Sequence, residues 1–260
     1  MCGRYAIIDG KKVLASFPML QQAVLASEVF QGLPQYNAAP MQKLPVVAVR
    51  GGTLTIQRMQ WWLVPHWSKE PATEFSTFNA KSETLEKSRL FGPYLKGSRC
   101  LVPADAFYEW KKAVVSKGPG KAAGELTEKH PMCIRMRSEE PFMFAGLFSV
   151  WKGEEEGAEL ATFTIITTAP NQLLAPIHNR MPVILREKEY DRWLDRDYHD
   201  TGELAKLLVA IPEKLMQAYR VSKLVNSAKN NLPECLEPVP EGGAGQPRRR
   251  REGGAHSPGS

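Results

Sequence analysis

The cysteine at position 2 has the most distinctive chemistry in this sequence. The initiator methionine is normally removed when so small a residue follows it, so the mature chain would begin with Cys2. An N-terminal cysteine carries a free α-amine, of ordinary pKa about 7.7–8.0, beside a thiol of pKa about 8.5. The amine can form a Schiff base with an aldehyde, and the thiol can then close a five-membered thiazolidine ring. A lowering of the thiol pKa by Arg4 would increase the thiolate fraction. The alternative is that Cys2 is a bystander at the chain end.

Two further segments carry residues suited to acid–base chemistry. Glu109 lies between Tyr108 and Trp110, and a carboxyl group partly removed from water has a raised pKa. His178 comes just before an apolar segment, where an imidazole could transfer protons. Each residue also has a structural interpretation, with Glu109 on the solvent face of a strand and His178 as a purely structural histidine.

Amide and cationic side chains occur in the segment 78–84 and beside His178. The sequence FNAKSET, residues 78–84, places Asn79 and Lys81 just before a predicted helix. Asn79 could cap a loop, whereas Lys81 could contact a phosphate. Arg180, two residues after the histidine discussed above, could hold a phosphate as well.

Aromatic residues gather in WWLVPHW, residues 61–67, which holds three of the six tryptophans. An exposed tryptophan such as Trp67, beside basic residues, would be a stacking platform for unpaired bases. Most such tryptophans belong to a core, so we expect one or two at most to be exposed. Asn37 and Pro40 lie in a predicted turn, YNAAP, where spacing alone assigns them no role.

The elements that must position these residues are mainly strands. Apolar, β-branched and alternating segments indicate strands, and Gly51-Gly52 indicates a hairpin turn between the first two. We therefore predict an α+β fold with a mainly antiparallel, barrel-like β core flanked by short helices. The predicted strands are 44–49, 53–59, 133–136, 143–150, 162–168 and 183–185, and the predicted helices are 11–26, 82–95 (with Ser82 as cap), 188–193 and 202–209.

Two segments differ in composition from the rest of the chain. Residues 115–129 are rich in Gly, Lys and Ala and are predicted to form an exposed loop. Residues 238–260 are rich in Gly, Pro and Arg, with four arginines at 248–251, and are predicted to be a disordered tail. The predicted organisation is therefore one folded domain, residues 1–237, followed by this tail.

Composition excludes several classes of protein. With 43% hydrophobic and 24% charged residues, the 260-residue chain is not wholly disordered. Its four cysteines form no CxxC pair, which argues against disulfide frameworks, zinc ribbons and thioredoxin-like sites. No HExxH, GxGxxG or P-loop motif is present. We predict neither a metal site nor another cofactor.

Charge and hydropathy give expectations about partner and compartment. The net charge of +6 favours an anionic partner. We find neither an apolar run of about 18 residues nor a signal peptide, so we expect no membrane span and no secretion. The expected home is the cytoplasm or nucleoid of a bacterium, or the nucleus of a eukaryote. We expect a monomer, since no coiled-coil pattern is present.

Nine short motifs, in this order, resemble the SOS-response-associated peptidase, or SRAP, family. The likeness runs from Cys2 to about Pro238. Each motif is weak alone, but their common order is specific. The motifs are MCGRY, YNAAP, WWLVPHW, FNAKSET, RCLVPADAFYEW, FAGLFSVW, TTAPN, IHNRMPVIL and VNSAKNNLPECLEP.

The resemblance implies a single SRAP-like domain that binds single-stranded DNA and cross-links covalently to abasic sites, protecting the lesion during the DNA damage response. By that likeness Cys2 is the nucleophile, and Asn79 positions it and the sugar. Glu109 is the general acid and base, and His178 assists sugar ring opening and cross-link reversal. The resemblance also implies the family's self-processing activity, which would remove Met1, and a lyase-type activity. The resemblance further implies phosphate contacts by Arg4, Lys81 and Arg180, and a DNA channel shaped by Asn37, Pro40 and Trp67.

Two departures from the family pattern bear on DNA binding. Lys81 stands where the family usually has arginine, which removes bidentate phosphate geometry. Trp62 replaces a usual glycine and could alter the backbone or add a stacking surface. Two other functions stay open at this point. One is a cysteine peptidase acting on other proteins, with His178 as base. The other is a non-covalent module for single-stranded or modified DNA.

Overall fold

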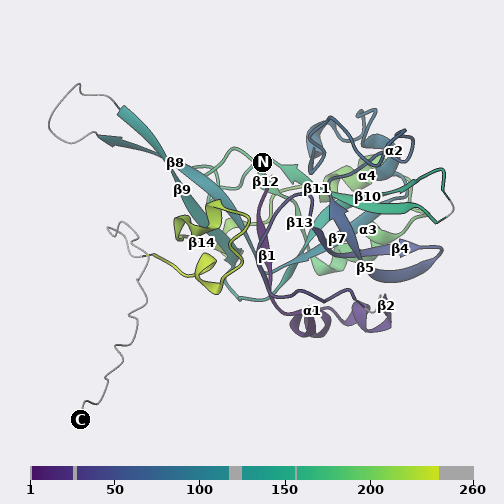
Figure 1. Ribbon diagram of the computed structural model, residues 1–260, viewed down its shortest axis with the longest axis horizontal. Helices are drawn as coiled ribbons and strands as arrows, with labels where there is room; N and C mark the ends of the chain where they lie inside the picture. The colour runs from purple at the N-terminus through teal and green to yellow at the C-terminus, as the bar shows by residue number, and fades with distance from the viewer. Residues whose placement is uncertain (1, 26–27, 117–124, 156, 240–260) are drawn as a thin grey trace, which may run out of the picture.

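The computed structural model describes residues 2–25, 28–116, 125–155 and 157–239. Five strands form a closed barrel in the order β11-β10-β7-β4-β5, and β5 returns to β11. The closing pair is parallel, with Gln60 opposite Thr162 and Trp61 opposite Phe163, whereas the other pairs of the ring are antiparallel. The predicted barrel-like, mainly antiparallel core is therefore confirmed (Figure 1). The barrel strands are β4 (Lys43–Arg50), β5 (Thr53–Trp61), β7 (Arg99–Ala104), β10 (Phe142–Lys152) and β11 (Glu159–Thr168).

Aromatic side chains fill the barrel. Trp61 is fully buried and lies edge-on to Tyr5 at 5.2 Å between ring centroids. The same indole stacks on Phe163 at 6.2 Å, and Tyr5 also meets Phe144 at 5.8 Å. Edge-to-face and stacked geometries of this kind add stability beyond apolar burial. The aromatic core thereby fixes β1, and the chain segment before it, against the barrel.

A second sheet carries the N-terminal strand. Its order is β14-β9-β8-β1-β3, and β1 pairs antiparallel with both β8 and β3. The β8–β9 ribbon extends from the body of the molecule in Figure 1. The sheet consists of β1 (Tyr5–Ile7), β3 (Gln35–Ala38), β8 (Ala106–Ser116), β9 (Glu125–Met136) and β14 (Met216–Arg220).

The predicted loop over residues 115–129 is wrong at both its ends. The β8–β9 ladder continues to the pair of Ser116 and Glu125. Val114 and Thr127, which are good strand formers, are paired within it. Residues 117–124 of the predicted loop lie outside the described residues. The tail predicted at 238–260 likewise lies outside them from residue 240 onward.

Two of the four predicted helices are broken into shorter pieces. The segment 11–26 becomes α1 (Gly10–Ser16), a 3₁₀ helix (Pro18–Gln22) and strand β2 (Val24–Leu25), because a proline interrupts the helical pattern. The segment 82–95 becomes a 3₁₀ turn (Ser82–Thr84) and α2 (Gly92–Leu95), and Ser82 is not a cap. The other two predictions correspond to α3 (Tyr190–Leu194), preceded by a 3₁₀ turn (Glu187–Glu189), and α4 (Thr201–Leu207).

Short strands beside β11 position the candidate site. Strand β6 (Asn79–Lys81) pairs parallel with β11, and β12 (Met181–Pro182) pairs antiparallel with its end. Strand β13 (Ile184–Leu185) then pairs antiparallel with β10. Two segments distant in sequence therefore meet at one end of β11, one bearing Asn79 and the other the residues before Met181. No helix among the described residues is long and apolar enough to cross a membrane.

Candidate active site

Cys2 and Glu109 are brought together by the pairing of β1 with β8. The ladder joins Tyr5 to Phe107, and the Tyr108 N–H donates to the Arg4 carbonyl at 3.0 Å. The antiparallel register then carries the segment before Arg4 along β8 toward Glu109. The Glu109 carboxylate acts electrostatically on the Cys2 thiol, which agrees with this proximity.

Glu109 is a buried carboxyl group. Only 2% of the residue is exposed, because Glu109 lies two residues after Phe107 and shares with it the face of β8 turned toward the barrel core. Burial raises the pKa of Glu109 to about 7, since desolvation disfavours its charged form. The interpretation of Glu109 as a solvent-face residue is therefore wrong. A carboxyl group with this pKa can both accept and donate a proton near neutral pH.

The Cys2 thiol is buried and protonated at neutral pH. Its Sγ–H donates to the Arg4 carbonyl over 3.8 Å. Burial, and secondly the Glu109 charge, raise the pKa of Cys2 far above its ordinary value. The idea that Arg4 increases the thiolate fraction is wrong, because the Arg4 guanidinium is bound to Asn37 Oδ1 at 2.8 Å and to the Val225 carbonyl at 2.6 Å.

His178 shares a pocket with Glu109. The two residues line a pocket of about 460 Å³, and His178 Nδ1 lies 3.9 Å from Glu109 Oε1. Burial lowers the pKa of His178. His178 Nδ1 lies 3.1 Å from the Arg180 backbone nitrogen and 3.2 Å from the Arg180 carbonyl oxygen, so it can accept from the first in one tautomer or donate to the second in the other. His178 is therefore suited to proton transfer in its neutral form.

Asn79 lies at the start of β6, and the nitrogen of its side-chain amide is already hydrogen-bonded. Its Nδ2 donates to the carbonyls of Phe78 at 3.0 Å and Ile165 at 3.3 Å. Its Oδ1 is buried and accepts no hydrogen bond from the described residues. The structure places no hydrogen bond between Asn79 and Cys2 within the described ranges. An acceptor oxygen of this kind is available to an amine or hydroxyl donor.

Arg4 and Asn37 join the N-terminal segment to the C-terminal part of the domain. Asn37 is 1% exposed, and its Nδ2 donates to the carbonyls of Ser227 and Asn230, both at 2.9 Å. The Arg4 guanidinium also lies 6.0 Å from the Trp110 ring centroid, within cation–π range. This network holds the backbone next to Cys2.

The remaining predicted DNA-binding residues differ in exposure. Trp67 is 60% exposed and Lys81 is exposed, whereas Pro40 is half-buried. Arg180 binds Glu83 in a bidentate ion pair with N–O distances of 2.5 and 2.8 Å, and it also donates to the Thr167 carbonyl. The expectation of one or two exposed tryptophans in the 61–67 segment is met by Trp67.

Four residues of the Glu109 pocket were absent from the sequence-based site, namely Trp110, Lys112, Lys129 and Asn226. Strand alternation in AFYEWKK would have placed Trp110 and Lys112 on one face. Lys129 was missed because its segment was predicted to be a loop. Asn226 accepts the Trp110 indole N–H at 2.7 Å, a long-range contact that leaves no local signal.

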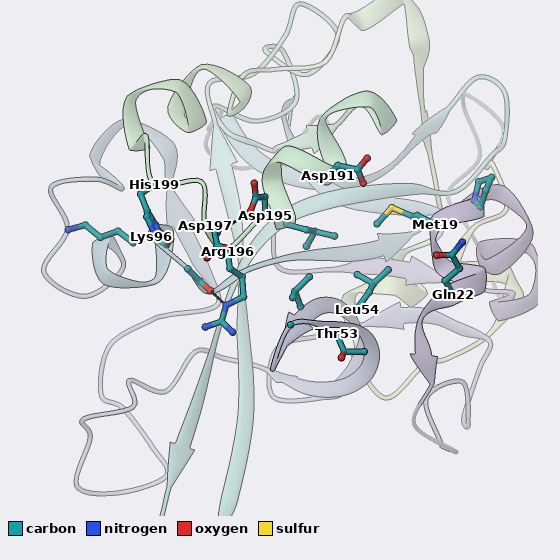
Figure 2. A pocket seen from close by; sticks show the side chains of 15 residues that line it. Met19, Gln22, Thr53, Leu54, Lys96, Asp191, Asp195, Arg196, Asp197 and His199 are labelled. Atoms are coloured by element: carbon teal, nitrogen blue, oxygen red, sulfur yellow. Dashed lines mark hydrogen bonds between the residues drawn. The ribbon is translucent and has the colours of Figure 1, made fainter.

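A larger pocket of about 1290 Å³ lies elsewhere, between the 3₁₀ helix Pro18–Gln22, the β4–β5 turn and α3 (Figure 2). Its lining combines apolar residues such as Met19 and Leu54 with charged residues such as Asp191 and Arg196. None of the predicted catalytic residues lines it. The shifted pKa values therefore single out the smaller pocket as the candidate active site.

Comparison with known proteins agrees with the sequence motifs. The family model for SOS response associated peptidase (SRAP) matches residues 1–228. The chain is 37% identical over 237 residues to the abasic site processing protein YoqW of Bacillus subtilis (strain 168), covering 91% of this chain and 99% of that protein. It is 36% identical over 225 residues to the abasic site processing protein HMCES of Gallus gallus, covering 79% of this chain and 66% of that protein.

The fold agrees with that of a solved protein from Bacteroides thetaiotaomicron. The two chains align with a TM-score of 0.75 at 26% identity, over 92% of this chain and 100% of the other. The family match, the relatives and the fold all cover most of the chain. This chain therefore belongs to the SRAP family.

Proposed function

We propose that this protein binds single-stranded DNA and forms a covalent cross-link between Cys2, exposed as the N-terminal residue by removal of Met1, and the aldehyde of an abasic site. The observation that carries the proposal is the buried Glu109 carboxyl group, with a pKa of about 7, acting on the Cys2 thiol. The names of the relatives, abasic site processing proteins, support the same substrate. Met1 lies outside the described residues.

The α-amine of Cys2 acts first. Its nitrogen lone pair attacks C1′ of the open-chain sugar, and the carbonyl oxygen takes up a proton to give a carbinolamine. Loss of that oxygen as water leaves the imine. Glu109 accepts the proton released by the amine and returns one to the departing oxygen, two tasks for which a pKa of about 7 is suited.

The thiol of Cys2 acts second. Its sulfur attacks the imine carbon, the C=N π electrons move to nitrogen, and the thiol proton is transferred to that nitrogen, completing a thiazolidine. The raised pKa of Cys2 keeps the thiol protonated before this step. A neutral buried thiol thus favours attack by the amine before attack by the sulfur, which fixes the order of the two bonds.

Asn79 and His178 serve the sugar. The buried Oδ1 of Asn79 would accept a hydrogen bond from the Cys2 amine or a sugar hydroxyl. Neutral His178 would take the hydroxyl proton of the closed sugar during ring opening, and would return a proton during cross-link reversal. The distance of 3.9 Å between His178 Nδ1 and Glu109 Oε1 allows a proton to pass between the two groups.

The DNA strand is held by groups of different kinds. Exposed Lys81 and ion-paired Arg180 would contact flanking phosphates, and exposed Trp67 would stack on an unpaired base. Pro40 and Asn37 would shape the channel. Arg4, already bound to Asn37, would support the channel mainly by fixing the N-terminal segment.

The test is incubation of Met1-processed protein with an abasic-site oligonucleotide, followed by a denaturing gel. We expect a retained adduct whose mass equals protein plus DNA minus one water. Cys2→Ser should give only a Schiff base that survives after borohydride reduction, because serine keeps the amine and loses the thiol. Cys2→Ala with a blocked amine should give no adduct. An adduct of wild-type yield from that last protein would overturn the proposal.

Turnover of an unrelated peptide would instead support the peptidase function suggested by the family description. The buried, protonated Cys2 thiol does not favour that function, since the thiolate is the nucleophile of cysteine peptidases. Salt-sensitive DNA binding without any adduct would support the non-covalent alternative.

A further inference from the structure

Two lysines lie at the pocket that contains Glu109 and His178. Lys112 on β8 and Lys129 on β9 are both exposed and both line this pocket. They are direct partners in the β8–β9 ladder. Directly opposed residues of an antiparallel pair point to the same face, so the two ammonium groups share one side of the ribbon. Trp110, two residues before Lys112, shares that face as well.

This arrangement is unfavourable without an anion. Like charges directly opposite each other destabilise a sheet. Among the described residues, neither lysine side chain forms a hydrogen bond or ion pair. The adjacent carboxylate, Glu128, is directed instead to Lys223 at 3.4 Å and His130 at 3.9 Å. The lysine pair therefore retains its positive charge at the mouth of the pocket.

The charge of this pair contrasts with that of the two arginines near the site. Arg4 is bound to Asn37 and to a backbone carbonyl, and Arg180 is neutralised by Glu83. Lys112 is also close enough to His178 to act on the imidazole electrostatically. An anion seated between the lysines would therefore lie next to the reacting sugar.

We propose that Lys112 and Lys129 together bind one backbone phosphate of single-stranded DNA, adjacent to the nucleotide held between Glu109 and His178. This inference rests on the proposed function, because it takes the pocket to be the place of the abasic sugar. Two flexible ammonium groups suit a phosphate as point charges without demanding bidentate geometry. The pair fixes the register of the strand, so that C1′ of the lesion faces Cys2.

The test measures non-covalent binding with an oligonucleotide whose abasic aldehyde has been reduced to an alcohol and cannot cross-link. The variant is Lys112→Gln/Lys129→Gln. The matched control is Lys96→Gln/Lys152→Gln, which removes the same charge from the large pocket of Figure 2 and from the end of β10. We expect the variant to bind about tenfold more weakly than the control, with a salt slope smaller by about 0.7, the value for one phosphate contact on single-stranded DNA.

A second measurement locates the phosphate. Neutral methylphosphonates replace single phosphates along the reduced oligonucleotide. In the wild-type protein, one position beside the lesion should weaken binding by about tenfold, and the same replacement should have no effect on Lys112→Gln/Lys129→Gln. Equal losses in both proteins at every position, or equal binding by variant and control, would overturn the proposal.

Cross-linking separates this inference from the function on which it rests. At saturating concentrations, Lys112→Gln/Lys129→Gln should still form the adduct with unreduced abasic DNA, because Cys2 and Glu109 are intact. Absence of any adduct from the wild-type protein would count against the proposed function. The result specific to the lysine pair is that Lys112→Gln/Lys129→Gln loses the phosphate contact but still forms the adduct.

Discussion

The imidazole Nδ1 of His178 lies 3.9 Å from Glu109 Oε1, and the two groups have exchanged their usual order of acidity. Burial raises the pKa of Glu109 to about 7 and lowers the pKa of His178 from its ordinary 6.5. The carboxyl group therefore holds a proton more tightly than the imidazole does. Near neutral pH the imidazole is therefore neutral, and the carboxyl group is present in both its protonated and its charged form.

The pH dependence of cross-linking should follow Glu109. At saturating DNA we expect the rate to be highest near pH 7, where both the base needed for amine attack and the acid needed for loss of water are present. Glu109→Gln should lower the rate at least about 100-fold and remove this maximum. Quenched-flow gels from pH 5 to 9 measure the profile. Glu159→Gln, at the start of β11, is the control, and an unchanged maximum in Glu109→Gln would contradict the assignment.

Glu109 should also make the protein less stable as pH rises. Its folded pKa, about 7, lies above the ordinary 4.5, so the folded state binds the proton more tightly. Stability is therefore lost between pH 4.5 and 7, by about 3 kcal/mol in total. Glu109→Gln, which is never charged, should raise Tm by about 6–12 °C at pH 8 and leave it nearly unchanged at pH 4. Calorimetry at the two pH values checks this, and an equal Tm shift at both would refute it.

Glu83 should compete with DNA for Arg180. Hydrogen bonding to Arg180 lowers the pKa of Glu83, so the carboxylate stays charged and bound to the guanidinium at neutral pH. Glu83→Gln weakens this pair and frees Arg180 for a phosphate. We expect affinity for single-stranded DNA to rise about three- to tenfold, with a salt slope larger by about 0.7. Fluorescence anisotropy measures both, with Glu203→Gln on α4 as a charge-matched control. Weaker binding would mean that Glu83 positions Arg180 instead.

The sequence alone predicts the barrel strands better than the helices, since two of the four predicted helices are broken into shorter pieces. The hairpin of β4 and β5 was predicted from alternation and from Gly51-Gly52, whose φ angles of 57° and 78° require glycine-like freedom. The strand pair that closes the barrel is harder to predict from the sequence, because β5 pairs with β11 about a hundred residues later and in the parallel sense. Such pairing depends on tertiary packing, which leaves no local pattern.

The candidate site shows the same division. Motif order pointed to Cys2, Glu109 and His178, and the structure brings Glu109 and His178 into one pocket. The sequence could not show that the Arg4 and Arg180 side chains are bound to Asn37 and Glu83, since both contacts join distant segments. For the same reason the sequence does not indicate the direction of the Cys2 pKa shift. Burial, which depends on the whole fold, outweighs the neighbouring charge.

Arg4 provides the last prediction, because its bonds favour positioning over phosphate binding. Its Nη1 donates to Asn37 and to the Val225 carbonyl. Arg4→Met keeps much of the apolar stem but leaves these acceptors unpaired, so we expect a loss of stability of about 2–3 kcal/mol.

The cross-linking rate at saturating DNA should fall as well, since the segment bearing Cys2 loses its anchor to Asn37. Affinity for reduced abasic DNA should change less, and the salt slope should stay constant. Denaturant titration, single-turnover gels and anisotropy at several salt concentrations separate the three quantities. A salt slope reduced by about 0.7 would show instead that Arg4 contacts a phosphate directly. Each phosphate contact on single-stranded DNA contributes about that amount to the slope, because binding releases the counterions of that phosphate.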